Sequence, residues 1–271
     1  MTTLTLPPAA RPAVLSGGAR AAFRTIPALI LREMSSTYGR SPGGYLWAVV
    51  EPVAAIALMS VAFSFILRAP GLGDNFSYFY ATGFLPFSLY MTVSMQVSAA
   101  LRFSRPLLEY PRVSYLDAVL ARFILNLMTQ ILVLAVVMTG IVVVFNLVPR
   151  IDVAGVGLTL LLASGLALGV GCVNCFLITS FPVWERVWAI ANRPMFLISA
   201  VLFLPEDLPE RYREWLMLNP LAHITSLSRS AFFTSYDAVS ASPLYVTGWV
   251  IGLLTLGLFL LATHHKEILL K

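Results

Sequence analysis

The chain has 271 residues, of which 58% are hydrophobic and only 11% are charged, and its formal net charge is +5 at pH 7. So few charged residues cannot cover the surface of a water-soluble protein of this length, and a soluble fold is therefore excluded. A helix of about 20 apolar residues crosses the hydrocarbon core of a bilayer. The composition thus predicts an all-α membrane protein with several spans.

The N-terminal residues are rich in Pro, Ala and Arg and lack the apolar stretch of a signal peptide. We expect residues 1–19 to be a flexible cytoplasmic segment. Residues 20–40 are predicted to form an amphipathic helix in the cytoplasmic interface, with an ordinary frayed helix as the alternative. The apolar residues recur every three to four positions, at Phe23, Ile26, Ile30 and Met34. The charged residues fall elsewhere on the helix, at Arg24, Arg32 and Glu33.

Six apolar segments without an internal repeat predict a single transmembrane domain over residues 20–271. The predicted spans are 46–67, 77–100, 118–147, 153–179, 184–204 and 243–263. With the N-terminus inside, thirteen of the 18 Lys and Arg residues fall in the cytoplasmic half. Because cytoplasmic segments carry an excess of Lys and Arg, this distribution predicts that both termini are cytoplasmic.

The first two spans contain candidates for a substrate path. Glu51 lies beside Pro52 inside the first span, where a carboxylate is too costly to face lipid, so we expect a structural or gating role. Aromatic residues cluster at the start of the second span, and the path candidates among them are Tyr80, Phe84, Phe87 and Tyr90. Rings that line a channel would contact a sliding polymer weakly and repeatedly. The alternative is an aromatic belt with lipid-facing rings.

The segment between the second and third spans, 101–117, mixes Arg and Pro with Leu and Tyr. A linker that only joins two helices would be shorter and more polar, so this mixed surface indicates docking to a protein partner. The candidate contact residues are Arg105, Leu107, Leu108, Tyr110 and Arg112.

Small residues mark the fourth span. Gly165, Gly169 and Gly171 predict close helix packing, either within one subunit or at a subunit interface. Cys172 and Cys175 form a CxxC in the same apolar helix, but two further ligands are not apparent nearby. We therefore interpret them as packing residues rather than zinc ligands.

The fifth span is ambiguous because its apolar run, from Met195 to Leu204, is too short to cross a bilayer. To span, the helix must start near Trp184 and carry Arg186 and Arg193 into the inner half of the membrane. These two residues are seven positions apart, close to two helical turns, and so share a face. Charges in a membrane usually face a bundle interior or a watery cavity. The alternative places both arginines in a cytoplasmic loop, where they only set the topology.

The region from Pro205 to about Ser242 is predicted to be external. Its apolar middle, Trp215 to Phe233, is interrupted by Asn219-Pro220. Because proline breaks a helix, two short re-entrant or interfacial helices are favoured over a span.

A polar, Arg-bearing segment leads from Arg32 directly into the first span at Pro52. It resembles the same region in permease subunits of type-2 ABC exporters of polysaccharides, most closely those that export capsular polysaccharide in Gram-negative bacteria. The resemblance is carried by Tyr38, Arg40, Ser41, Gly44, Leu46, Trp47 and Pro52. Glu51 points to the capsule branch rather than the O-antigen branch. The similarity runs from about Arg24 to the C-terminus.

The resemblance implies the membrane subunit of an ATP-driven exporter that moves lipid-linked capsular polysaccharide across the bacterial inner membrane. It further implies a homodimer and two ATP-binding subunits, which contact the 20–40 helix and a coupling helix within 101–117. A periplasmic co-polymerase and an outer-membrane polysaccharide channel are the later partners. No G-x-x-x-x-G-K-[ST] motif occurs, so ATP and Mg are expected in the partner subunit. This chain is expected to bind no cofactor, metal or nucleic acid.

Two alternatives remain open. A type-2 permease of this kind could export O-antigen, teichoic acid or a small lipid or drug. A membrane-embedded glycolipid enzyme is the alternative from another class, and it would need a nucleophile and an acid or base held together. His223 has Ser226 one turn away, but no acid to complete a triad is evident.

Overall fold

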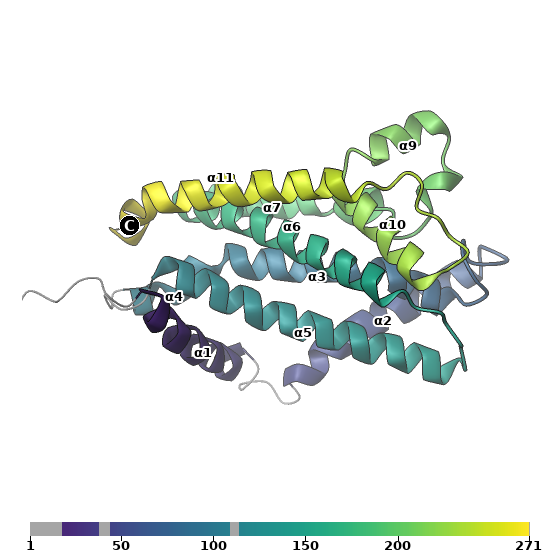
Figure 1. Cartoon of the computed structure of the whole chain (residues 1–271), viewed down its shortest axis with the longest axis horizontal. Coiled ribbons are helices and arrows are strands. Elements are labelled where there is room, and N and C mark those ends of the chain that lie inside the picture. The colour runs from purple at the N-terminus through teal and green to yellow at the C-terminus, as the bar shows by residue number, and fades with distance from the viewer. Residues whose placement is uncertain (1–17, 38–43, 109–113, 271) are drawn as a thin grey trace, which may run out of the picture.

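The computed structural model describes residues 18–37, 44–108 and 114–270. Within these ranges it leaves out the side chains of 18–24, 35–37, 45, 105–108 and 264–270. The prediction that residues 1–19 are flexible falls outside the described residues, apart from the first two residues of helix α1. Every regular element in the described ranges is a helix, which confirms the all-α prediction (Figure 1).

The helices follow one another along the chain with short connections. They are α1 (Gly18–Thr37), α2 (Gly44–Ser64), α3 (Phe76–Ser98), α4 (Ala100–Leu108), α5 (Tyr115–Val144), α6 (Val153–Ser180), α7 (Val183–Asn192), α8 (Met195–Ile198), η1 (Pro205–Asp207), α9 (Glu210–Leu216), α10 (Pro220–Phe232) and α11 (Pro243–Leu270). Four helices of the described chain are long and apolar enough to cross a membrane, namely α2, α5, α6 and α11. Helix α3 has 23 residues, but its Tyr, Ser and Thr side chains make it less apolar.

Polar side chains set the starts of several helices. Ser114 begins α5 with a capping box, because its hydroxyl accepts from the Leu116 N–H while its own N–H donates to the Asp117 carboxylate. Helix α5 therefore starts before the predicted residue 118. Asn219 caps α10 by accepting from the Leu221 N–H, and Pro220 occupies the first helical position.

Glycines allow α6 to approach two other helices closely. A Cβ added at Gly169 would lie 2.9 Å from the Cβ of Leu253 in α11, and one at Gly171 would lie 2.7 Å from the Cβ of Val97 in α3. Gly257 of α11 faces back onto Cys172, since a Cβ there would lie 2.6 Å from the Cys172 Cβ. The prediction of close packing within one subunit is confirmed for these glycines.

Helix α3 lies at the centre of the bundle, where it packs against α2, α5, α6 and α10. Most of its side chains are buried, including Tyr78, Phe79 and Tyr80 near its start. The core therefore forms around a helix that is itself rich in aromatic and hydroxyl groups, and α10 from the C-terminal half of the chain covers one side of it.

The single helix predicted over 184–204 is wrong. Helix α7 ends at Asn192, and only the four residues of α8 follow before the helix ends again. Pro194 lies at the break. It has no N–H and so cannot donate the next backbone hydrogen bond of the helix. Ala200 then takes a left-handed conformation with φ of 54°, and the chain runs without helix to η1. Farther on, α9 and α10 confirm the predicted helix break at Asn219-Pro220.

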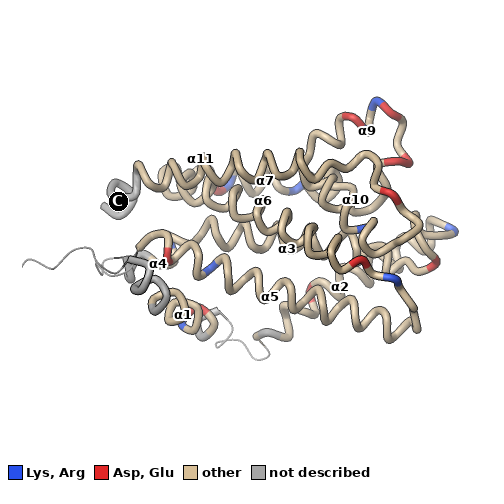
Figure 2. The backbone as a smooth tube through the Cα atoms, viewed as in Figure 1, with Lys and Arg blue, Asp and Glu red and all other residues tan. Residues whose placement is uncertain are grey.

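The two ends of the bundle differ. Figure 1 shows α1, α4 and the C-terminal end of α11 together at one end, which we call the α4 end. Helix α9 and the connection from α5 to α6 lie at the opposite, α9 end (Figure 1). Lys, Arg, Asp and Glu are absent from the middle of α5, α6 and α11, as Figure 2 shows. This distribution fits helices that cross an apolar layer between two polar ends.

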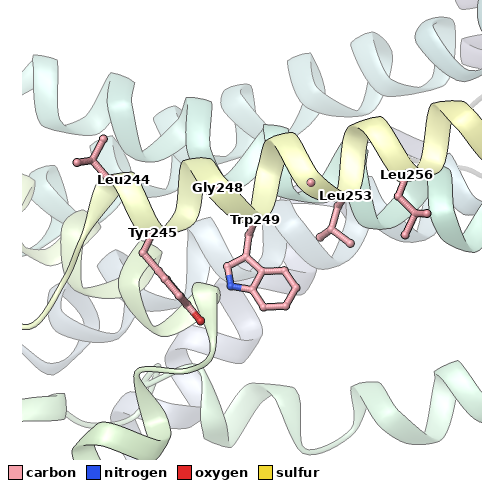
Figure 3. A pocket seen from close by; sticks show the side chains of 7 residues that line it. Leu244, Tyr245, Gly248, Trp249, Leu253 and Leu256 are labelled. Carbon is pink, nitrogen blue, oxygen red and sulfur yellow. The ribbon is translucent and has the colours of Figure 1, made fainter.

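The outer face of α11 forms an apolar groove of about 510 Å³. Side chains of Tyr245, Trp249 and Leu256 border it (Figure 3). Gly248 and Gly252 lie in the groove, and a Cβ at either would meet nothing within 4 Å among the described residues. These two glycines differ from Gly169 and Gly171 of α6, because no described side chain packs on them.

Candidate functional site

Helix α4 occupies the position that the sequence predicts for contact with a partner protein. The chain is helical from Ala100 to Leu108, only one residue after α3 ends. The side chains of Arg105, Leu107 and Leu108 are not described, and Tyr110 and Arg112 lie outside the described residues. A helix at this position agrees with the expected coupling helix, whereas its partner contacts stay a prediction.

An exposed ion pair connects α4 to α7. The Arg102 guanidinium donates two hydrogen bonds to the Glu185 carboxylate, at 2.7 and 3.0 Å. The two side chains are 59% and 49% exposed. The hydrogen bonds from Glu185 raise the pKa of Arg102 above its ordinary value. Water and salt screen such a pair strongly, so its contribution to stability is small. Its bidentate geometry is the arrangement that arginine and a carboxylate prefer.

Arg186 and Arg193, the predicted substrate-path cations, are both exposed in the protomer. Helix α7 buries none of its residues. The backbone stays helical through Arg193, with φ of −60° and ψ of −46°, so the spacing of seven residues keeps both arginines on one face. A second subunit, lipid or water must therefore cover this helix.

Glu51 lies on the exposed side of α2, whereas Pro52 is buried. Proline inside the helix removes one backbone hydrogen bond. The Glu51 carboxylate itself is accessible, because no described neighbour covers that side of α2. This placement agrees with a Glu51 that faces a subunit interface or an aqueous path, and its role stays a prediction.

The predicted path aromatics lie in the core of the protomer. Tyr80, Phe87 and Tyr90 are 0%, 6% and 4% exposed, and Phe84 is half-buried against Phe196, with ring centroids 6.3 Å apart. In this conformation the buried rings face neither lipid nor a channel. The physical reason is that other helices of the protomer pack on the rings. Tyr80 lies against Phe63 of α2, with ring centroids 5.4 Å apart, and Phe87 lies against Phe196 of α8 at 5.6 Å.

A buried ion pair at the α4 end was not expected from the sequence. The Arg122 Nη2 and Nε atoms of α5 lie 2.6 and 2.8 Å from the Glu33 Oε1 atom of α1. The side chains are only 5% and 10% exposed. Sequence periodicity places Glu33 outside the apolar stripe of α1, but an ion pair with a residue far along the chain gives it a buried position. An arginine in the first turns of a predicted span is the one signal that could have indicated it.

Arg229 of α10 is a second unexpected buried charge, 0% exposed. Its guanidinium donates to the carbonyl oxygens of Ala200, Val201 and Phe203 at 2.7 to 2.8 Å and lies 4.4 Å from the centroid of the Phe79 ring. Burial lowers the pKa of Arg229 to about 10, which still leaves it charged at neutral pH. Arg229 thus secures the non-helical segment that follows α8.

His223 and the two cysteines show structural rather than catalytic surroundings. His223 Nε2 is 2.7 Å from the Met217 carbonyl oxygen, and Nδ1 accepts from the Ser242 N–H. Both ring nitrogens are thus engaged, and burial lowers the pKa of His223. Because both nitrogens contact backbone groups, neither is free for the Ser226 hydroxyl, and a Ser–His pair does not form. Cys172 and Cys175 are buried and free, which agrees with packing.

Taken together, four long apolar helices and charged groups gathered toward the two ends of the bundle define a helical membrane protein with several spans. The family follows from comparison with known proteins. The chain belongs to the ABC-2 type transporter family, which matches residues 24–233. This membership confirms the family resemblance drawn from the stretch between Arg32 and Pro52.

Curated relatives match nearly the whole chain. It is 28% identical over 245 residues to the polysialic acid transport protein KpsM of Escherichia coli, covering 90% of this chain and 95% of that protein. It is 26% identical over 245 residues to the capsule polysaccharide export inner-membrane protein CtrC of Neisseria meningitidis serogroup A, covering 90% and 92%. The capsule polysaccharide export inner-membrane protein BexB of Haemophilus influenzae is 25% identical over 249 residues, with 90% and 92% covered.

Proposed function

We propose that this chain is the membrane subunit of an ATP-driven exporter that moves lipid-linked capsular polysaccharide across a bacterial inner membrane. The observation that carries the proposal is the nature of its relatives. Three proteins that match 90% of this chain are named for transport or export of polysialic acid or capsule polysaccharide. Because the match covers at least 92% of each relative, it includes their transport machinery rather than a shared fragment.

The proposed topology has six spans with both termini in the cytoplasm. Helices α2, α5, α6 and α11 supply four spans, α3 supplies another, and the broken segment α7–α8 supplies the last. The α4 end then faces the cytoplasm and the α9 end faces the periplasm. Helix α1 lies in the cytoplasmic interface, and the short helices α9 and α10 enter from the periplasmic side. The excess of Lys and Arg in the segments assigned to the cytoplasm supports this orientation.

ATP is hydrolysed by a separate subunit, and this chain is a permease without enzymatic activity of its own. A sequence without a phosphate-binding loop motif supports this division. Two copies of the chain form a homodimer, and each contacts one ATP-binding subunit through α1 and α4. Mg accompanies ATP in that partner. A periplasmic co-polymerase and an outer-membrane channel receive the polymer.

The conduit lies between the two copies. Helices α2 and α7 support this assignment, because each exposes polar or charged groups that would be costly against lipid, Glu51 on α2 and Arg186 and Arg193 on α7. A dimer brings four arginines to one vestibule. That positive field would attract the acidic sugars or phosphate at the end of a lipid-linked polymer.

Co-purification and ATPase assays test the function. The chain is co-expressed with an ATP-binding protein encoded beside it, purified, and assayed with lipid-linked capsular polysaccharide. We expect a stable complex whose ATP hydrolysis rises with this substrate. A partner whose nucleotide-binding lysine is replaced is the matched control, since it retains the contacts but cannot hydrolyse ATP. Failure to bind any ATP-binding protein, or turnover of a glycolipid without ATP, would refute the proposal.

A further inference from the structure

Arg122 contacts more than its ionic partner Glu33. Its Nη1 atom donates to the Gln96 carbonyl oxygen of α3 at 3.2 Å. Its guanidinium carbon lies 4.1 Å from the centroid of the Phe103 ring of α4, within the range of a cation–π interaction. One side chain of α5 thus contacts α1, α3 and α4 simultaneously.

A second contact of α4 lies next to the one with Arg122. Phe103 stacks on Arg122, and the preceding residue, Arg102, forms the ion pair with Glu185 of α7. Helix α4 is therefore connected to α5 through Phe103 and to α7 through Arg102. The two contacts differ in strength, because the Arg102–Glu185 pair is exposed and screened whereas Arg122 is 4% exposed.

A buried ion pair is not needed to hold helices together. Apolar side chains of similar volume often stabilise such a junction equally well or better. A charged pair with directional hydrogen bonds instead allows one relative placement of the helices and penalises others, because any other placement leaves a buried charge unpaired. At Arg122, one side chain makes such directional contacts with both α1 and α4.

We propose that Arg122 is a positioning residue for ATP-driven transport, because it holds α1 and α4 on the start of α5 as one unit. The inference rests on the proposed function, in which α1 and α4 both contact the ATP-binding subunit. A displacement imposed on α4 then moves α1 and α5 with it and reaches the spans. Without Arg122 the partner still binds, but α4 and α1 shift separately. The movement of α4 then no longer displaces the transmembrane helices.

The test uses the full complex with its ATP-binding subunit in proteoliposomes. The variants are Arg122→Gln, Glu33→Gln and the exchanged pair Glu33→Arg/Arg122→Glu. Arg150→Gln, an exposed arginine at the other end of the bundle, is the matched control. We expect each single variant to co-purify with the partner and hydrolyse ATP, while polysaccharide moved per ATP falls about tenfold, an ordinary size for a coupling effect. The exchanged pair should recover most of that ratio.

Two results would overturn the inference. One is an unchanged transport-to-hydrolysis ratio in both single variants. The other is an exchanged pair no better than the single variants although it inserts and binds its partner, because pairing would then not be the source of the effect. An inactive wild-type complex would instead refute the proposed function, so the two failures are distinguishable.

A distance measurement on otherwise native protein covers the case in which the variants misfold. Spin labels are placed at Leu31 of α1 and Leu120 of α5, which are 67% and 38% exposed. We expect the same distance distribution in the nucleotide-free and ATP-bound complex. A change of about one helical turn, roughly 5 Å, would show that the two helices move separately and would contradict the inference.

Discussion

Two buried arginines, Arg122 at the α4 end and Arg229 toward the α9 end, satisfy their charge in different ways. Arg122 pairs with the carboxylate of Glu33, which belongs to another helix. Arg229 instead donates to three backbone carbonyl oxygens of a segment without helix. Each guanidinium also lies over a phenylalanine ring, Phe103 or Phe79.

The difference determines which substitutions each site tolerates. Both partners of the Arg122–Glu33 pair are side chains, so both can be mutated together to an apolar pair of similar volume. Backbone carbonyls cannot be removed by mutation, and the segment from Ala200 to Phe203 would keep its unsatisfied oxygens if Arg229 were lost. We therefore interpret Arg229 as essential to folding and Arg122 as essential to coordinated movement.

The largest effect is expected from Arg229→Gln. This change leaves several buried carbonyls without donors and should lower the free energy of unfolding by more than about 3 kcal/mol. Thermal unfolding monitored by size-exclusion chromatography in detergent would measure the loss. Arg229→Lys should also be destabilising, because one ammonium group cannot reach all three carbonyls as the planar guanidinium does. A lysine variant that unfolds at the wild-type temperature would contradict the architectural role.

A smaller effect on stability is expected when both partners of the other junction become apolar. In the double variant Glu33→Met/Arg122→Leu no charge stays unpaired, so the free energy of unfolding should change by within about 1 kcal/mol. Transport per ATP should nevertheless fall, since the directional contacts to Gln96 and Phe103 are gone. If this variant unfolds as readily as Arg229→Gln, the distinction between the two arginines fails.

The smallest effect on stability is expected at the exposed arginines of α7. Arg186→Gln/Arg193→Gln should change the free energy of unfolding by within about 0.5 kcal/mol, because neither side chain is buried. Association with the ATP-binding subunit should persist, while capsule at the cell surface is lost. Arg186→Lys/Arg193→Lys is the control that retains charge. Normal capsule levels in a correctly inserted double Gln protein would exclude these residues from the substrate path.

Local patterns predicted much of the fold. Apolar runs located the helices, and a start signal such as Ser114 with Asp117 three residues later is readable because the cap interacts within one turn. The break between α7 and α8 was missed although Pro194 is visible in the sequence. The predicted span required a continuous helix, whereas the structure replaces it with a bend secured by Arg229, which lies 29 residues beyond Ala200.

The functional groups were harder to predict because their surroundings come from distant segments. Glu33 was assigned to the polar side of its helix, yet Arg122, 89 residues away, brings it into the interior. Tyr80 and Tyr90 have the amphipathic character of channel or belt residues, but α3 occupies the centre of the protomer and buries them. Periodicity along one helix reports neither the partner of a charge nor which helix will be central.

The most direct test of the account measures translocation itself. Inverted inner-membrane vesicles that contain this chain and its ATP-binding partner are supplied with lipid-linked capsular polysaccharide, and an external polysaccharide-degrading enzyme then removes all polymer outside. We predict that ATP protects a fraction of the polymer inside the vesicles, and that protection disappears with the hydrolysis-deficient partner. Polymer that stays fully degradable while the complex hydrolyses ATP would contradict the account.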